Sequence, residues 1–183
     1  QRELMATARE SATALLTLID EILDFTKIEA DRLELERTAL SPAQVVESAC
    51  EALSSIADKN DIDLMLYCDP TLPGSVWTDP GRLRQILMNL GGNAVKFAKP
   101  IDGGRGRVLI RIDLLSQTAR RASMRVAVID NGIGMNDDTM AMLFRPFVQG
   151  ESSTTRRFGG TGLGLSISQR IAQAMQTEIS VKS

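Results

Sequence analysis

Two asparagines one helical turn apart, with a lysine just beyond, are the first residues whose spacing could support chemistry. The stretch NLGGNAVKF carries Asn89, Asn93 and Lys96 inside an apolar helical pattern. Residues four apart share one face of a helix, so the two amides project from the same side. Two interpretations are open on this stretch alone: ordinary polar positions on a helix surface, or oxygen ligands for a hard cation.

A second stretch, DNGIGM, follows a predicted strand and begins at Asp130. A carboxylate held at a strand end can accept a hydrogen bond from an exocyclic amine. Gly132 and Gly134 permit positive φ angles and allow a ligand to approach the backbone closely. The alternative interpretation is an ordinary Asp-Asn-Gly turn.

A third stretch, FGGTGLGLS, places four glycines directly before an amphipathic helix. Backbone N–H groups and the positive end of the helix dipole would form an anion site there that suits phosphates. A flexible linker fits less well, because Leu163 and Leu165 follow at once. The spacing matches neither the dinucleotide fingerprint nor the Walker A loop.

The segment between the two glycine stretches has the composition of a mobile lid. It begins with FRPF, in which Phe144 and Phe147 would be the anchors, and ends in Arg156 and Arg157. Those arginines could reach phosphate oxygens, although arginines in a solvated loop often contact nothing. Both interpretations of the two arginines are open.

The first helix is predicted to run from Leu4 to about Glu29. Its apolar positions alternate four- and three-residue steps, which is a heptad seam, and further apolar residues widen the face toward a helical bundle. Such a face needs a partner helix, a second copy, or both. Folding back on its own domain is the alternative.

The remaining periodicity predicts three further helices and six short strands. Ser41-Pro42 and Asp79-Pro80 are cap-plus-proline signals that open two of the helices. The predicted helices run from Pro42 to about Asp58, from Pro80 to about Phe97, and from Gly164 to about Met175. The predicted strands are Thr38–Leu40, Asp63–Cys68, Ser75–Thr78, an antiparallel pair at Val108–Leu115 and Met124–Asp130, and a last one beginning at Glu178–Val181.

Composition excludes several classes of protein. The 183 residues carry a net charge of −2, with 43% hydrophobic and 24% charged residues, so no general basic surface points to nucleic acid. No apolar run approaches the roughly 20 residues that span a bilayer, and the N-terminus does not resemble a signal peptide. Two cysteines are too few for a disulfide framework. Histidine is absent, which excludes it as ligand, base or phosphoacceptor within this chain.

Together the motifs resemble the catalytic, ATP-binding domain of sensor histidine kinases. NLGGNAVKF is similar to that family's N box, DNGIGM to its first glycine box, FRPF to its phenylalanine box and GGTGLGLS to its second glycine box, all in the family's order. The N-terminal IDEILDFTKIEADRLELE resembles the second helix of the dimerisation and phosphotransfer domain of hybrid-type kinases. The resemblance covers nearly the whole chain.

The resemblance implies an α+β fold of the Bergerat (GHKL) type. This is a two-layer α/β sandwich with a mixed, mostly antiparallel sheet, preceded by a long bundle helix. It implies ATP and Mg²⁺, with Asn93 as metal ligand assisted by Asn89, Lys96 on phosphate and Asp130 on the adenine amino group. The remaining implied nucleotide-binding residues are Gly132, Gly134, Met135, Phe147, Arg156, Arg157, Gly160, Thr161, Gly162, Leu163 and Gly164.

Asn89 also bears on the reaction. Related ATPases of the gyrase and mismatch-repair type place a glutamate one turn before the metal asparagine, and an amide cannot act as that general base. Phosphoryl transfer to a separately supplied nucleophile therefore fits better than hydrolysis. A non-catalytic module that binds nucleotide or a partner is the alternative from another class, and direct ATP hydrolysis is the third.

The resemblance further implies what accompanies this chain. The phosphoaccepting histidine belongs to a preceding helix, so we expect residues 1–32 to be half of the phosphotransfer domain. We expect residues 33–183 to be the catalytic domain without its last strand. Expected partners are the missing helix, a response regulator or receiver domain, and a second copy in the intact protein. This segment is expected in the cytoplasm, with anchoring of a full-length protein in the inner membrane left open.

Overall fold

The structure is a computed structural model that describes residues 2–30, 32–99, 104–148 and 161–183. Its residues divide into two compact units. We call Gln1–Glu34 with Asp138–Ser180 the helical unit, and Leu35–Asp137 with Val181–Ser183 the sheet unit. The predicted division at residues 32 and 33 stays a prediction about domains.

The sheet unit contains a mixed sheet of three strands in the order β2-β4-β5. β2 (Ile62–Cys68) runs parallel to β4 (Gly106–Gln117), and β4 runs antiparallel to β5 (Ala122–Asp130). A separate antiparallel pair joins β1 (Thr38–Leu40) to β3 (Val76–Thr78). The mixed sheet that the resemblance implies is therefore observed, with one parallel and one antiparallel pair among its described strands.

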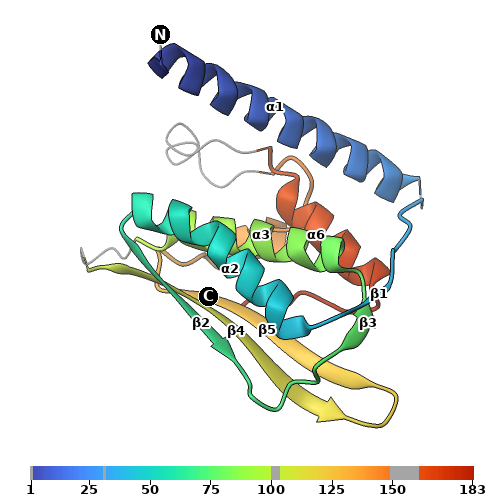
Figure 1. Ribbon diagram of the computed structural model, residues 1–183. Helices are drawn as coiled ribbons and strands as arrows, with labels where there is room; N and C mark the ends of the chain where they lie inside the picture. The colour runs from blue at the N-terminus through green and yellow to red at the C-terminus, as the bar shows by residue number, and fades with distance from the viewer. Residues whose placement is uncertain (1, 31, 100–103, 149–160) are drawn as a thin grey trace. The chain divides into compact units, whose positions relative to one another are not determined.

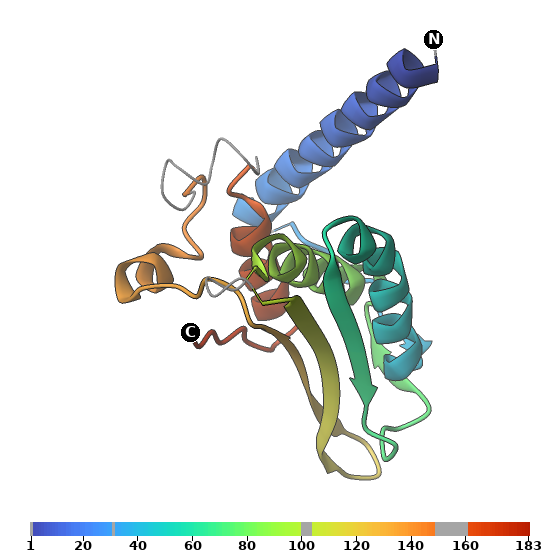
Figure 2. The same cartoon turned by 90° about the vertical axis from the view of Figure 1, so that its left-hand side faces the viewer.

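Two helices of the sheet unit cover the same face of this sheet, as both views show (Figure 1, Figure 2). They are α2 (Pro42–Lys59) and α3 (Pro80–Phe97), and their apolar faces meet the sheet in one core. Strand and helix periodicity explain this burial, because Val108, Ile110 and Ile112 alternate on β4 and are at most 1% exposed. The two-layer arrangement follows from that single apolar face on each element.

The predicted helix starts at Ser41 and Asp79 are confirmed. The Ser41 hydroxyl accepts a hydrogen bond from the Gln44 N–H at 3.4 Å. The buried Asp79 carboxylate does more, because its Oδ1 accepts from the Arg82 N–H and its Oδ2 accepts from the Glu36 N–H, both at 2.9 Å. Asp79 therefore fixes the start of α3 and ties it to the chain before β1.

The helical unit contains α1 (Arg2–Glu29) and α6 (Gly164–Ala174), which contact each other. The short helix α4 (Asp137–Met142) was not predicted. Several large apolar side chains on α1 are open to solvent. Its exposed apolar side chains include Met5, Leu15, Leu16, Leu18, Ile19, Ile22 and Leu23.

The strand expected at Glu178–Val181 is absent, so that prediction is wrong. Residues 177–183 carry no strand assignment. A strand requires a ladder of backbone hydrogen bonds to a neighbour. The described segment forms one such bond at its start, from the Thr177 N–H to the Ala172 carbonyl, which belongs to the end of α6. Its alternating apolar residues alone do not create a ladder.

Candidate functional site

One face of α3 holds the asparagine pair and the lysine. Asn89, Asn93 and Lys96 are half-buried and share this face, and Gly92 lies beside Lys96 at its edge. A Cβ placed on Gly92 would have no described atom within 4 Å, apart from its two chain neighbours and its own helix backbone. The predicted amides and lysine therefore lie next to a helix position that more distant described residues leave uncovered.

The neighbouring Gly91 has a different role. A Cβ at Gly91 would lie 2.4 Å from Cδ1 of Leu53, a fully buried residue of α2. Gly91 therefore lets α2 and α3 pack closely, whereas Gly92, about 100° further around the helix, is left uncovered. Each glycine lowers helix stability by about 1 kcal/mol relative to alanine. Gly91 allows close helix packing, and Gly92 leaves space beside the helix.

Lys96 is a cation in a partly desolvated place. Burial lowers the pKa of its ammonium from the ordinary value of 10.5. Its Nζ lies 4.9 Å from the centroid of the Phe97 ring, which gives some cation–π stabilisation. A half-buried ammonium gains from an anionic ligand that replaces lost water, so this position suits a phosphate.

The first glycine segment packs directly against the end of α3. A Cβ on Gly132 would lie 2.1 Å from the Phe97 carbonyl oxygen, so only glycine fits without movement. The Gly132 N–H donates to Oδ1 of Asp130 at 2.9 Å. The structure therefore brings Asp130 and Gly132, from the end of β5, next to the helix that carries Asn93 and Lys96.

Asn131 is a structural residue that the sequence reasoning missed. Its Oδ1 accepts a hydrogen bond from the Arg107 N–H at 2.7 Å, and its Nδ2 donates to the Arg105 carbonyl at 3.1 Å. These bonds hold the end of β5 on the start of β4, so the aspartate before it is held as well. The Asp-Asn-Gly signal could have suggested this, because asparagine commonly bonds nearby backbone.

Gly134 adopts the left-handed region with φ of 67°, as the predicted glycine role requires. The next residue, Met135, is half-buried, and its N–H donates to the Ser183 hydroxyl at 2.6 Å. Among the predicted nucleotide residues of the sheet unit, Gly132 thus contacts the end of α3, and Gly134 and Met135 follow it along the chain.

The described part of the second glycine segment lies in the helical unit. Gly162 has φ of 71°, and its carbonyl accepts from the Phe147 N–H at 3.1 Å. The Thr161 hydroxyl accepts from the Leu163 N–H at 3.1 Å. Leu163 is buried immediately before Gly164 begins α6. The predicted arrangement of a glycine turn followed by a helix start is therefore present.

Phe147 anchors its segment to α1 by a contact that the sequence did not predict. Its ring meets the Phe25 ring edge-on, with centroids 5.8 Å apart, although the side chain is 66% exposed. Phe144 is half-buried. Arg156, Arg157 and Gly160 lie outside the described residues, so their predicted contacts stay predictions.

The donor set around α3 bears on the expected Mg²⁺. Within the described residues, no group of three or more His, Cys, Asp or Glu side chains could hold a metal ion. Asn89 and Asn93 offer neutral amide oxygens, which suit a cation that takes most other ligands from phosphate and water. The residues present fit a magnesium ion that arrives with a nucleotide.

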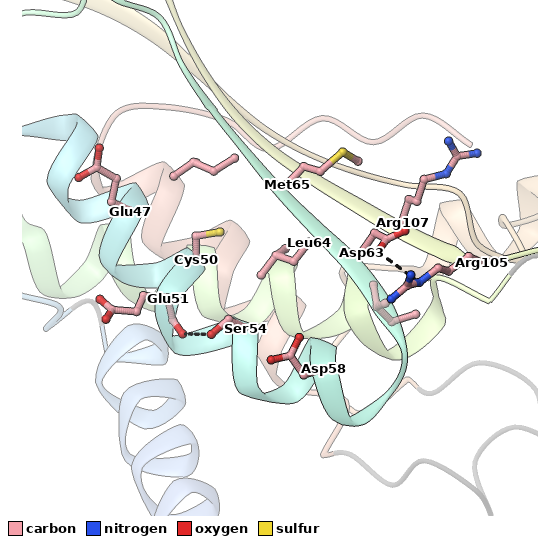
Figure 3. Close-up of a pocket in the computed structure, with 12 residues that line it drawn as sticks. Glu47, Cys50, Glu51, Ser54, Asp58, Asp63, Leu64, Met65, Arg105 and Arg107 are labelled. Carbon is pink, nitrogen blue, oxygen red and sulfur yellow. Dashed lines mark hydrogen bonds and ion pairs between the residues drawn. The ribbon is translucent and has the colours of Figure 1, made fainter.

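A hollow on the surface of the sheet unit lies away from these residues. It is open between α2 and the edge strand β2 (Figure 3). Its wall is mixed, with α2 carboxylates facing apolar residues of β2, and Arg105 pairing with Asp63 at 3.2 Å. The lining residues include Glu47, Cys50, Glu51, Ser54, Asp58, Leu64, Met65 and Arg107. None of the predicted nucleotide residues lines this hollow.

The sequence matches a known family over more than half its length. Residues 78–183 match the family described as histidine kinase-, DNA gyrase B-, and HSP90-like ATPase, and the chain belongs to this family. The match confirms the ATP-binding class and the GHKL fold that the four motifs predicted.

Curated relatives carry kinase names. The chain is 36% identical to hybrid signal transduction histidine kinase F of Dictyostelium discoideum, over 98% of this chain and 16% of that protein. It is 37% identical to sensor protein GacS of Pseudomonas syringae, over 100% of this chain and 20% of that protein. The chain therefore spans a fifth or less of the length of these relatives.

Among solved structures, full-length ShkA in complex with AMPPNP resembles this chain with a TM-score of 0.76 and 34% identity. The match covers 96% of this chain and 34% of ShkA. The predicted resemblance to sensor histidine kinases is confirmed. In the described part of the chain, the structure contains no helix whose length and apolar content would let it cross a membrane.

Proposed function

We propose that this chain is the ATP-binding catalytic part of a histidine kinase, which transfers the γ-phosphoryl group to a histidine on a separate helix. The observation that carries the proposal is the α3 face. Asn89, Asn93 and Lys96 share one side of the helix, with the uncovered Gly92 at its edge, and the first glycine segment packs against the end of the same helix. A nucleotide needs this combination of oxygen ligands, a cation and approachable backbone.

Each predicted nucleotide-binding residue of the sheet unit has a proposed role. Asp130 accepts a hydrogen bond from the adenine amino group, next to a backbone shaped by Gly132, Gly134 and Met135. Lys96 contacts phosphate as a point charge. Asn93, assisted by Asn89, would hold Mg²⁺. When bound, the ion would neutralise phosphate charge.

The second glycine segment would contact the phosphates. Its backbone N–H groups precede α6, and helix starts of this kind bind anions. Residues proposed for this set are Phe147, Arg156, Arg157, Gly160, Thr161, Gly162, Leu163 and Gly164.

Transfer is favoured over hydrolysis by the chemistry of the amides. Asn89 cannot take a proton from water, so the α3 face offers no general base at the position where related ATPases carry one. The chain contains no histidine, so the acceptor is proposed to reside on another helix. The similar ShkA was solved with AMPPNP, and the curated relatives are named histidine kinases, which supports both nucleotide and reaction class.

The proposed partners follow from that reaction. They are the phosphoacceptor helix, a response regulator or receiver domain that takes the phosphoryl group onward, and a second copy in the intact protein. We propose a cytoplasmic location for this segment.

Calorimetric titration with a non-hydrolysable ATP analogue tests the proposal. We expect binding that Mg²⁺ strengthens, and Asn93→Ala should remove the strengthening. Asp130→Asn should weaken binding about tenfold or more with and without Mg²⁺, the usual effect of losing a hydrogen bond to a charged group. Gln117→Ala, an exposed amide at the far end of β4, serves as the control and should bind as the parent does.

A folded chain that binds no nucleotide would contradict the proposal. It would favour the alternative of a non-catalytic module that binds a partner. Circular dichroism on the same samples establishes that the chain is folded.

A further inference from the structure

One face of α1 makes three contacts within the helical unit. Glu21, Phe25 and Glu29 follow at four-residue spacing and so share that face. Glu21 contacts Thr161, Phe25 contacts Phe147, and Glu29 contacts Arg170 of α6 at 3.6 Å. This column of α1 therefore contacts the second glycine segment, the phenylalanine segment and the helix that follows.

The contact at Glu21 is a short hydrogen bond. The Thr161 hydroxyl donates a hydrogen bond to Oε2 of Glu21 at 2.6 Å, and the pair is partly buried. The same hydroxyl accepts from the Leu163 N–H at the start of α6. A hydroxyl has a single proton, so Thr161 cannot give that proton to a phosphate while it gives it to Glu21.

The charge of Glu21 acts in the same direction. Its carboxylate stands one hydroxyl group away from the start of α6, where the helix dipole favours an anion. A nucleotide would bring several negative charges to this segment, and like charges at such short range repel. The negative charge of Glu21 therefore opposes the binding of a phosphate at the start of α6.

We infer that Glu21 of α1 is a positioning residue that lowers the nucleotide affinity of this chain by holding Thr161 and opposing phosphate charge. This inference rests on the proposed function, since it concerns the same nucleotide. High affinity then requires Glu21 to leave Thr161, so a displacement of α1 along or about its axis changes ATP binding. Such a displacement would also change the aromatic contact of Phe25 and the ion pair of Glu29, because both lie on the same face of α1.

The test compares Glu21→Gln with Asp20→Asn by calorimetric titration of the 183-residue chain. Both substitutions remove one negative charge, but Asp20 is an exposed neighbour on another side of α1. Glutamine keeps the size of the side chain. We expect Glu21→Gln to tighten binding of the ATP analogue about three- to tenfold more than Asp20→Asn does, with the difference shrinking at high salt.

Adenosine separates charge from a general loosening of the helical unit. Because it carries no phosphate, its affinity should be the same in the parent, in Glu21→Gln and in Asp20→Asn. A substitution that simply opened the site would tighten adenosine and the ATP analogue together, and that result would overturn the inference.

The remaining outcomes are equally decisive. If the parent binds the ATP analogue and Glu21→Gln binds no more tightly than Asp20→Asn, Glu21 does not oppose the nucleotide and the proposed function survives alone. Weaker binding in Glu21→Gln would show that Glu21 supports the site and would also overturn the inference. If the folded parent binds neither adenosine nor the ATP analogue, the proposed function fails and the inference fails with it.

Discussion

The charged side chain of Lys96 lowers the stability of the folded chain as long as no anionic ligand is bound. Burial lowers the pKa of its ammonium below 10.5, so the folded chain holds this proton less tightly than the unfolded chain does. The sign follows directly: the charged form opposes folding at neutral pH, and stability rises with pH through the window between the lowered pKa and 10.5. A bound phosphate would reverse the shift.

We therefore predict that Lys96→Met weakens the ATP analogue about tenfold or more, because a charge-assisted contact is lost, while stability at pH 7 does not fall. In the parent, affinity should decline as pH rises toward deprotonation of Lys96, and the variant should be flat over the same range. Calorimetric titration from pH 7 to 10 and thermal denaturation measure both effects.

Lys99→Met is the matched control, since Lys99 is exposed two residues past the end of α3. It should leave affinity and its pH dependence unchanged. Equal weakening in the two lysine variants would assign the effect to net charge and remove Lys96 from the site.

At the scale of the element, adjacent glycines of α3 have different surroundings. Gly91 faces Leu53 of α2, and Gly92 faces open space among the described atoms. We predict that Gly92→Ala stabilises the chain by about 1 kcal/mol through helix propensity. We expect it to weaken the ATP analogue, because the added methyl group occupies the space that the nucleotide would use.

Gly91→Ala should behave in the opposite way. Its methyl group forces the buried Leu53 to move, and overpacking of this kind costs about 1–3 kcal/mol, which offsets or outweighs the gain of about 1 kcal/mol in helix propensity. ATP affinity should be unchanged. Thermal denaturation measures the stability of Gly91→Ala and Gly92→Ala, and calorimetric titration measures their affinity for the ATP analogue. Higher stability in both variants, or weaker binding in both, would contradict the different roles given to the two glycines.

The elements themselves were largely predictable because their signals are local. Ser41-Pro42 and Asp79-Pro80 open α2 and α3 where expected, and the antiparallel pair β4 and β5 was correctly recognised. The pairing of β2 with β4 was not, since parallel strands join residues about 44 apart and leave no local turn signal. α4 was not predicted because its six residues show no apolar periodicity. The predicted last strand was wrong because residues 177–183 form no ladder of backbone hydrogen bonds with a neighbouring strand.

The sequence predicts roles for Asn89, Asn93 and Asp130 from residue type and motif order, and those roles stay predictions. The close approach of Gly132 to Phe97 agrees with the expected need for a glycine there. The contacts of Glu21 with Thr161 and of Phe25 with Phe147 join residues more than 100 apart. Periodicity within α1 cannot reveal them, because it reports only which residues share a face.

At the scale of the whole molecule, α1 carries more apolar surface than its unit buries. Leu15, Leu18 and Ile22 belong to the predicted heptad seam and are 58%, 37% and 51% exposed. Water-exposed aliphatic side chains in a continuous seam favour association with another helix. A second copy of this chain supplies a matching seam, which agrees with the proposed pairing in the intact protein.

We predict concentration-dependent self-association of the chain in sedimentation velocity experiments, and its loss in Ile22→Lys. The lysine places an ammonium in the seam, where desolvation opposes pairing. Asp20→Lys introduces the same group outside the heptad positions and should associate as the parent does. A parent chain that stays monomeric at every concentration, or an Ile22→Lys variant that pairs normally, would mean that the α1 seam is not the surface through which two copies meet.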